Sequence, residues 1–275
     1  HPPPWSKLTK VAEDTYRTLT AVDSVILVID CVKGVEAQTE RLMEVCRMRD
    51  TPVIIFINKM DLEGRDGFDL LDELEDKLSI KVCPLSWPIS QGHTFQGVYN
   101  LFDSTLRLFQ SHKQKITEDL LSIEGLDDPA IDEMVGDEHA AQLREDVEMV
   151  QGVYDALDMD AYARGEVAPV FFGSAVNNFG VQEMLDSFIR IAPTPRPRST
   201  TQREVDPTEE KFSGFIFKIH ANIDPRHRDR IAFLRVCSGT FKRGVLYKHT
   251  RLNKKLRFSN PATFMASAKA VVDEA

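Results

Sequence analysis

The sequence predicts an α/β fold in which a doubly wound parallel sheet, interrupted by an inserted subdomain, is followed by a small β-barrel. Continuous apolar segments typical of strands buried on both faces occur at 25–29, 53–57 and 169–172, and amphipathic helical patterns follow them. A proline-rich linker spans 193–210. Beyond it, short alternating segments separated by glycine turns replace the helices, which indicates an all-β second domain.

The first two strands form a predicted βαβ unit. A helical pattern over 13–21 precedes the strand Val25–Asp30, which ends in a carboxylate. From Val35 apolar positions recur at three- and four-residue steps, so we expect an amphipathic helix that ends at residues 50–52. The strand that starts at Val53 would then lie parallel to the first, joined to it by a right-handed crossover.

Two more strands and two more helices complete the predicted α/β core. A helix is expected from about residue 66 to 78, and the strand after it, 80–88, contains Pro84 and Pro88, which favour an edge position. The strand over 169–175 precedes the last helix. The expected inner faces are Phe68, Leu71, Leu74 and Leu78 for one helix and Val181, Met184, Leu185 and Phe188 for the other.

An insertion at about residues 90–165 interrupts this rhythm. Alternating apolar residues over 98–102 and 106–109 predict a hairpin, and 117–165 is acidic and helical. These helices are either a solvated face or a partner surface. The apolar stripe of the helical part is Ala140, Leu143, Val147 and Val150.

Composition is that of a globular protein that stays out of the membrane. Of 275 residues 42% are apolar and 28% charged, with no apolar run of membrane-spanning length and no apolar signal core after His1. We therefore expect a cytoplasmic protein. Cys31, Cys46, Cys83 and Cys237 are widely spaced without a C-x-x-C pair, so reduced thiols are favoured over a disulfide frame or metal site.

Charge is distributed unevenly along the chain. Residues 211–257 carry 13 Lys or Arg against Asp224 and Asp229, a net +11, whereas residues 1–210 carry 20 against 39 acidic residues, a net −19. This asymmetry suggests that the basic second domain meets nucleic acid or a ribonucleoprotein. The alternative is a barrel surface that is basic without a partner.

The tetrapeptide Asn58-Lys59-Met60-Asp61 follows the apolar strand 53–57 directly. It would lie at the carboxyl edge of the sheet, where open α/β sheets bind ligands. There an Asn side chain can donate and accept at a purine edge, a Lys stem can lie along the base, and an Asp carboxylate can accept two hydrogen bonds from neighbouring N–H groups. Guanine presents that donor pair and adenine does not. An ordinary polar turn is the alternative.

Ser174 and Ala175 stand at the end of the next core strand, before a loop and a helix. A strand that ends in Gly-Ser-Ala is expected to leave backbone N–H groups and a small hydroxyl facing outward, able to donate to a base carbonyl. We therefore expect Ser174 and Ala175 to complete the site begun by Asn58, Lys59 and Asp61.

These pieces, taken in order, resemble the translational GTPases, and the resemblance covers roughly residues 12–275. Asn58 to Asp61 matches the N-K-x-D guanine motif of that family. Within the family the resemblance is strongest to the bacterial peptide chain release factor 3 branch. The segments that carry it are Glu13–Ser24, Leu85–Ile89, Pro169–Ala175 and Asp224–Phe233, whereas Lys33–Glu36 belongs to the resemblance to the family as a whole.

The resemblance implies a P-loop-GTPase-like sheet over 12–192 and a translation-factor barrel over 211–275. It implies a GTP- or GDP-binding hydrolase of protein biosynthesis, active in translation termination, which docks on the ribosome and uses GTP to eject class I release factors. Asn58 and Asp61 would hold guanine, Lys59 would stack along it, and the Ser174 and Ala175 backbone would meet the base oxygen.

The family's phosphate-binding half is missing from the sequence. No G-x-x-x-x-G-K-[ST] phosphate loop occurs in it, and neither does the family's D-x-x-G segment with the His after it. Since phosphoryl transfer depends on positioning and charge stabilisation at the γ-phosphate, we expect no catalytic residue and no GTP turnover in these 275 residues. Mg²⁺ is expected only in the complete protein. We accordingly expect a fragment, with residues 1–11 as a leader or out-of-context segment and both domains incomplete; the alternative is a sequence from which internal stretches have been left out.

Other readings of the sequence remain open. The chain could belong to an elongation factor G-like GTPase, or act as a non-hydrolysing GTPase-like interaction module. The loop Asp224–Arg230 could contact ribosomal RNA or neutralise its own charges. His220, His227 and His249 lack metal-ligand spacing, so no metal site is assigned. A monomer without membrane contact is expected.

Overall fold

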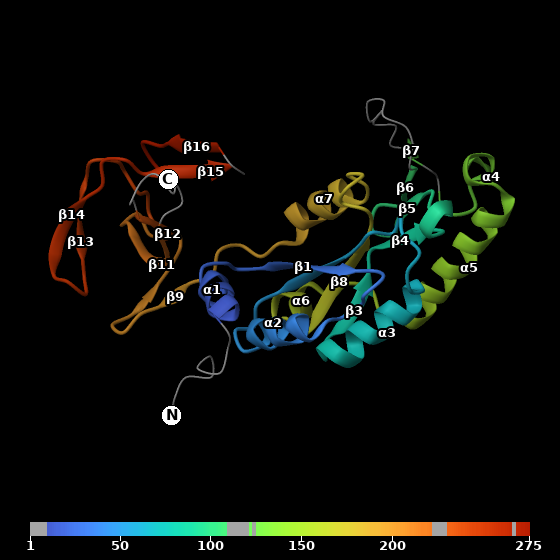
Figure 1. Ribbon diagram of the computed structural model, residues 1–275, viewed down its shortest axis with the longest axis horizontal. Coiled ribbons are helices and arrows are strands. Elements are labelled where there is room, and N and C mark those ends of the chain that lie inside the picture. Colours follow the sequence, from blue (N-terminus) through green and yellow to red (C-terminus); the bar gives the residue numbers. More distant parts are fainter. Residues whose placement is uncertain (1–9, 109–120, 123–124, 222–229, 266–267) are drawn as a thin grey trace. The chain divides into compact units, whose positions relative to one another are not determined.

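The computed structural model describes residues 10–108, 121–122, 125–221, 230–265 and 268–275 (Figure 1). Three predicted segments lie wholly or partly outside these ranges: residues 1–9 of the expected leader, most of the predicted contact loop Asp224–Arg230 with His227, and the first residues of the predicted acidic helical region. The chain divides into two compact units, one formed by residues 22–193 and the other by 10–21 with 194–275. Each is described separately below.

A four-stranded parallel sheet forms the centre of the 22–193 unit, in the order β1-β2-β8-β3. β2 is buried along five of its six residues, as its unbroken apolar sequence predicts, whereas β1 at one edge is only partly buried. β3, with Pro84, takes the other edge, as predicted. The strands are β1 Val25–Asp30, β2 Val53–Asn58, β3 Lys81–Pro84 and β8 Val167–Phe172.

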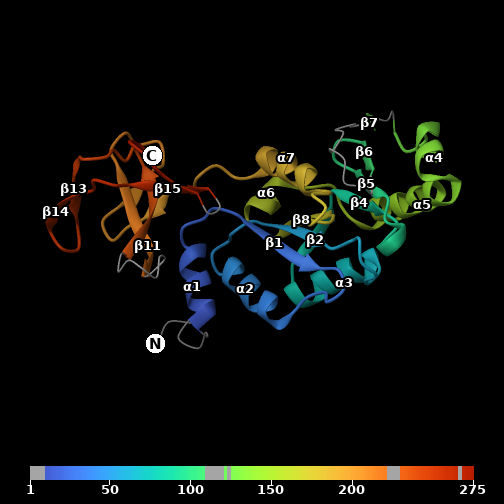
Figure 2. The same cartoon turned by 45° about the horizontal axis from the view of Figure 1, so that its top comes forward.

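Helices cover both faces of this sheet, so the predicted doubly wound α/β fold is confirmed (Figure 2). One face packs against α6 and α7 in a core that includes Phe56, Tyr162, Phe171 and Met184. On the other face α2 and α3 lie side by side. The bounds are α2 Ala37–Arg47, α3 Gly67–Leu78, α6 Met159–Ala163 and α7 Val181–Ile191.

A second, antiparallel sheet, β4-β5-β6-β7, is inserted in this unit together with α4 and α5. The hairpin β5–β6 is as predicted, and the predicted stripe Ala140, Leu143, Val147 and Val150 is buried. The Trp87 indole Nε1 donates to Asp146 Oδ2 at 2.9 Å, which joins α5 to β4. The bounds are β4 Ser86–Ile89, the 3₁₀ turn Gly92–Thr94, β5 Gly97–Asn100, β6 Thr105–Leu108, β7 Leu121–Ser122, α4 Pro129–Val135 and α5 Asp137–Val153.

Two sequence predictions in this unit are wrong in detail. The segment 80–88 forms two strands in two different sheets, because the Leu85 N–H donates to Val170 O at the end of β3 while its carbonyl accepts from Leu101 N beside β4, both at 2.9 Å. Leu185 does not face inward but is 43% exposed. Its place on the inner face is taken by Glu183, whose buried carboxylate pairs with Arg107 of β6.

The other unit is β-rich, as predicted. Helix α1, Lys10–Leu19, belongs to it, and its strands pair as antiparallel hairpins. Phe212, Phe241, Tyr247 and Phe258 form an aromatic cluster in which Phe241 is buried, with neighbouring ring centroids 4.6–6.4 Å apart. The strands are β9 Arg198–Ser199, β10 Glu204–Val205, β11 Ser213–Ala221, β12 Arg230–Ser238, β13 Leu246–His249, β14 Lys254–Arg257, β15 Ala262–Met265 and β16 Ala268–Val271.

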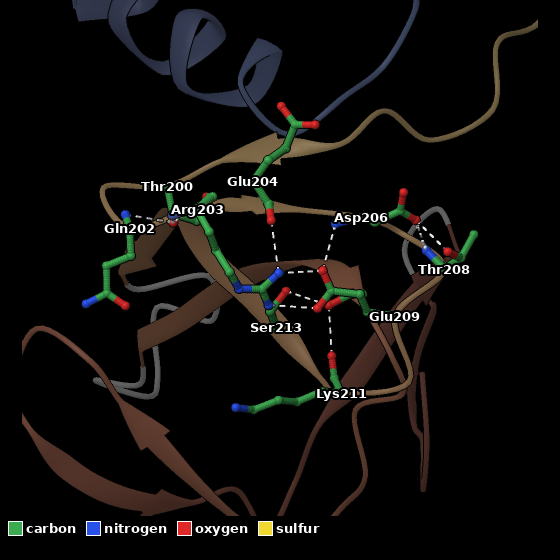
Figure 3. A network of polar contacts seen from close by, with 10 residues as sticks. Thr200, Gln202, Arg203, Glu204, Asp206, Thr208, Glu209, Lys211 and Ser213 are labelled. Atoms are coloured by element: carbon green, nitrogen blue, oxygen red, sulfur yellow. Dashed lines mark hydrogen bonds and ion pairs between the residues drawn. The ribbon is translucent and has the colours of Figure 1, made fainter.

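The linker contains ordered structure that its prolines did not predict. β9 and β10 form a short hairpin, and Arg203 closes it by donating to both carboxylate oxygens of Glu209, at 2.5 and 2.7 Å (Figure 3). The Asp206 N–H also donates to Glu209, at 3.0 Å. These three bonds lower the pKa of Glu209 to about 2.

Candidate functional site

The loops after β2 and β8 meet at the carboxyl edge of the parallel sheet. The strands are neighbours and parallel, so both loops leave the same edge. The Met60 N–H donates to Gly173 O at 3.1 Å, and the Ala175 N–H donates to the Asn58 side-chain oxygen at 2.8 Å. The structure therefore brings the tetrapeptide 58–61 and residues 174–175 together, as the sequence predicts.

Asn58 uses its acceptor within the protein. Its Oδ1 accepts from the N–H of Lys59 and from the N–H of Ala175, both at 2.8 Å. The expectation that this side chain both donates and accepts at a ligand is therefore wrong for the acceptor, because an internal bond clamps the two loops. The amide Nδ2 has no hydrogen bond within the described residues, so it can still donate to a ligand.

Lys59 is fixed at its backbone and at its side-chain end. Its φ is +71°, and its carbonyl accepts from Leu62 N at 2.9 Å and from the Cys31 thiol at 3.1 Å. The ammonium forms an ion pair with Asp30 at 2.6 Å. The Lys59 ammonium lowers the pKa of Asp30, and Asp30 in turn raises the pKa of Lys59.

Asp61 is different from its neighbours, because within the described residues its carboxylate accepts no hydrogen bond and forms no ion pair. It is half-buried at the same sheet edge, where it acts electrostatically on Lys59 and Cys31. A carboxylate held in place without a protein partner is suited to accept hydrogen bonds from a ligand.

Ser174 does not present its hydroxyl outward as predicted. Its side chain is 1% exposed, with Oγ accepting from Asn177 Nδ2 at 2.9 Å, and its N–H donates to Phe179 O at 2.9 Å. The Ala175 N–H is also engaged, by Asn58. A base oxygen at Ala175 would therefore have to share that N–H with Asn58.

The inserted segment contacts both loops of this edge. The Gly92 N–H donates to Met60 O at 2.9 Å, and the rings of Phe95 and Phe179 meet edge to face with centroids 5.4 Å apart. The same short segment therefore contacts the loop after β2 and the loop after β8. It restricts the motion of both loops without using the free groups of Asn58 and Asp61.

Two residues of this edge were not identified from the sequence. Asp30 was noted only as the last residue of a strand, although its register partner in the sheet is Asn58. Gly173 was treated as part of a strand end, although a β-carbon there would overlap Phe179 O. A carboxylate that ends the strand next to an N-K-x-D strand is a signal that could have identified Asp30.

The residues present do not fit a magnesium site. Among the described residues no group of three His, Cys, Asp or Glu side chains is placed to hold a metal ion. No described helix is both long and apolar enough to cross a bilayer. The four cysteines are free, and Cys31, Cys46 and Cys83 are buried.

Two protein-family models match the chain. The model described as the elongation factor Tu GTP binding domain matches residues 10–194, and the one described as elongation factor G domain 2 matches residues 211–275. Since the first match spans more than half of the chain, the chain belongs to the translational GTPase family, whose nucleotide domain binds guanine nucleotides.

A solved structure shows the same fold over nearly the whole chain. It is a crystal structure of a protein from Thermus thermophilus, with a TM-score of 0.67 and 19% sequence identity. The alignment covers 96% of this chain and 39% of the other chain. This chain therefore spans well under half the length of the protein that shares its fold.

Proposed function

We propose that the chain is the base-recognising part of a GTP-binding translation termination factor, the release factor 3 type of translational GTPase. The complete protein would use GTP to free class I release factors from the ribosome in the cytoplasm, acting as a monomer. The observation that carries the nucleotide part is the joined edge of 58–61 and 174–175, where the Asp61 carboxylate has no partner among the residues that the structure describes.

Each residue has a separate role at the base. Asp61 accepts from the ring N–H and the neighbouring amino group of guanine, a donor pair that adenine lacks. The Asn58 amide donates to a ring nitrogen, and the Lys59 stem lies along the base plane. The Ala175 N–H, in the loop fixed by Ser174, meets the base oxygen. Binding would thus be selective for guanine.

Hydrolysis is proposed for the complete protein only. These 275 residues contain no phosphate loop and no D-x-x-G segment followed by His, so they supply base contacts without the groups that position the γ-phosphate. We expect guanine preference without turnover from this chain. Mg²⁺ would be held by groups of the complete protein.

The charges of the β13–β14 hairpin are the argument for docking on the ribosome. No acidic residue stands between Asp229 and Asp273, and Lys248 lies directly opposite Lys255 across the hairpin. Like charges in that arrangement repel, and an anionic partner relieves the repulsion. The exposed cations of the hairpin, without an acidic partner in the described residues, are Lys248, Arg251, Lys254, Lys255 and Arg257.

Guanosine and adenosine binding to the 275-residue chain tests the nucleotide part. NMR titration should show shifts at residues 58–61 and 173–176 with guanosine, and at least about tenfold weaker binding of adenosine, since two hydrogen bonds to a carboxylate are lost. Equal binding of the two nucleosides, or shifts elsewhere, would contradict guanine recognition.

The termination part needs the complete gene product and ribosomes. On ribosomes that have released their peptide, it should speed the dissociation of a labelled class I release factor in the presence of GTP. An elongation factor G-like protein, the second candidate, would instead move transfer RNA and messenger RNA by one codon. The match of residues 211–275 to elongation factor G domain 2 favours testing that alternative in parallel.

A further inference from the structure

We propose that Asp30 is a positioning residue for guanine recognition. By holding the Lys59 ammonium at the end of β1, it lays the Lys59 stem across the sheet edge and keeps that cation away from Asp61. This inference rests on the proposed function, because it assigns Asp30 a role at the same base site.

Asp30 is a rigid anchor. Its Oδ1 accepts from the Val32 N–H at 2.9 Å and from the Lys33 N–H at 3.3 Å, and its carbonyl accepts from the Gly34 N–H at 2.8 Å. The other carboxylate oxygen, Oδ2, is left for the Lys59 ammonium. The side chain is 18% exposed, so the anchor is partly shielded from water. A cation bound to Oδ2 therefore has a fixed destination.

The path of Lys59 follows from its two fixed ends. Its backbone is held at the end of β2 by Asn58 Oδ1 and by the donors from Leu62 and Cys31. Its Nζ is held at the end of β1, the neighbouring strand. The methylene stem must therefore run across the carboxyl edge from β2 to β1. A stem already held in place loses less rotamer freedom when a base lies on it.

Asp61 is the acceptor that would compete for Lys59. It lies two residues after Lys59, acts on it electrostatically and has no other partner within the described residues. An ammonium released from Asp30 would be drawn to Asp61 and would occupy the oxygens that read guanine. Asp30 and Asp61 thus both act electrostatically on Lys59, and the Asp30 anchor decides which of these two carboxylates stays free.

The substitution Asp30→Asn separates charge from shape. The amide oxygen still accepts from Val32 and Lys33, whereas the charge that holds Lys59 is lost. Asp132→Asn is the matched control, since Asp132 also binds a cation, Arg144, but lies on α4 in the inserted region. Both variants are made in the 275-residue chain.

A measurement without nucleotide tests the anchor itself. Limited acetylation with acetic anhydride, followed by mass spectrometry, reports how reactive Lys59 is relative to exposed Lys81 in the same molecule. In an Asp61→Asn background, which removes the second carboxylate, we expect Asp30→Asn to raise the Lys59 rate by about threefold or more, because loss of the ion pair increases the free amine. Asp132→Asn in the same background should leave the ratio unchanged. An unchanged ratio in the variant that combines Asp61→Asn with Asp30→Asn overturns the proposal.

A measurement with nucleosides tests the role at the base. Asp30→Asn should weaken guanosine binding about tenfold, the loss expected when Asp61 pairs with Lys59, and should change adenosine binding little. In a Lys59→Met background, which has no cation to release, Asp30→Asn should add no further loss. An equal loss in that background would mean that Asp30 has only a structural role, and would overturn the proposal.

The two measurements also separate this inference from the proposed function. If the unsubstituted chain shows no preference for guanosine, guanine recognition fails, and the role of Asp30 at a base fails with it. The acetylation ratio then still decides whether Asp30 holds Lys59. If guanosine is preferred and Asp30→Asn changes neither readout, the proposed function stands and this inference alone is wrong.

Discussion

The loops at the carboxyl edge of the parallel sheet and the β13–β14 hairpin both carry charged groups. The two regions differ in whether their cations have acidic partners. At the sheet edge the Lys59 ammonium is paired with Asp30, Asn58 Oδ1 joins the two loops, and the Asp61 carboxylate has no partner within the described part of the chain. On the hairpin the exposed cations have no acidic partner in the described residues, and Lys248 faces Lys255.

This difference indicates two kinds of recognition. At the sheet edge many internal hydrogen bonds hold a few polar groups in place, which suits a small ligand that is recognised by hydrogen bonds. The two-stranded hairpin carries several exposed cations, which suits an extended polyanion. Such a partner is bound by charge, and its binding weakens as salt increases. Substitutions should therefore act sharply and locally at the edge, and gradually at the hairpin.

The largest effect is expected from Gly173→Ala. A β-carbon at Gly173 would overlap Phe179 O and crowd the Phe56 ring, so the loop after β8 cannot keep its path. We expect the free energy of unfolding to fall by about 2–4 kcal/mol in a urea titration, with loss of guanosine binding.

Gly152→Ala is the control for that change. Gly152 lies in α5, and a β-carbon there meets nothing within 4 Å, so the substitution should raise stability slightly, by up to about 1 kcal/mol. Equal stability of the two variants would show that the loop after β8 is not as tightly packed as the structure has it.

Asp61→Asn should exchange the preferred base. The amide of Asn donates where the carboxylate accepts, so it repels the guanine amino group and suits the carbonyl of xanthine. Guanosine affinity should fall about thirtyfold, close to 2 kcal/mol, and xanthosine affinity should rise, as measured by NMR titration. The fold should be unaffected. Unchanged guanosine preference would remove Asp61 from the site.

Removal of hairpin charge should act through salt dependence. The double substitution Lys248→Gln with Lys255→Gln should weaken binding to ribosomal RNA uniformly across sequences. The slope of log affinity against log salt should become shallower by about one to two. Lys81→Gln, at an exposed position of the other unit, is the control and should leave the slope unchanged. A sequence-selective loss would argue against simple phosphate contacts.

The sequence identified what local patterns determine. The apolar run of β2 predicts a strand buried on both faces, and the polar residues after it mark the carboxyl edge, because both features lie within one short segment. The pairing of Asp30 with Lys59 spans 29 positions, and the Glu183–Arg107 pair links α7 to the inserted sheet. Such partners depend on strand order and insertion geometry, which periodicity does not encode.

The sequence-based prediction for the groups around Ser174 is wrong for the same reason: their hydrogen-bond partners depend on how the loop folds back. A strand end followed by a loop predicts open N–H groups, yet Phe179 and Asn58 take them, because Gly173 and the positive φ of Gly180 fold the loop back on β8. Leu85 is a second example of a feature that the sequence pattern does not predict. One apolar segment there supplies strands to two sheets, and nothing in its composition marks the change of partner.

The smallest effect is expected at the Arg203–Glu209 pair of the linker, which is paired like the sheet edge but exposed like the hairpin. Arg203→Gln should raise the pKa of Glu209 from about 2 towards its ordinary value of 4.5. A depressed carboxylate pKa contributes stability above pH 4.5 that is lost as pH falls towards 2, so the substitution removes that contribution.

Carboxyl NMR titration of Glu209 measures this change, with Glu166 as the internal control. Glu166 is paired with Arg164 in the other unit, and its lowered pKa should not move when Arg203 is replaced. Because the pair is exposed, solvent screening should keep the change in stability small even though the pKa change is large. A Glu209 pKa unaltered by Arg203→Gln would assign its depression to the Asp206 N–H instead.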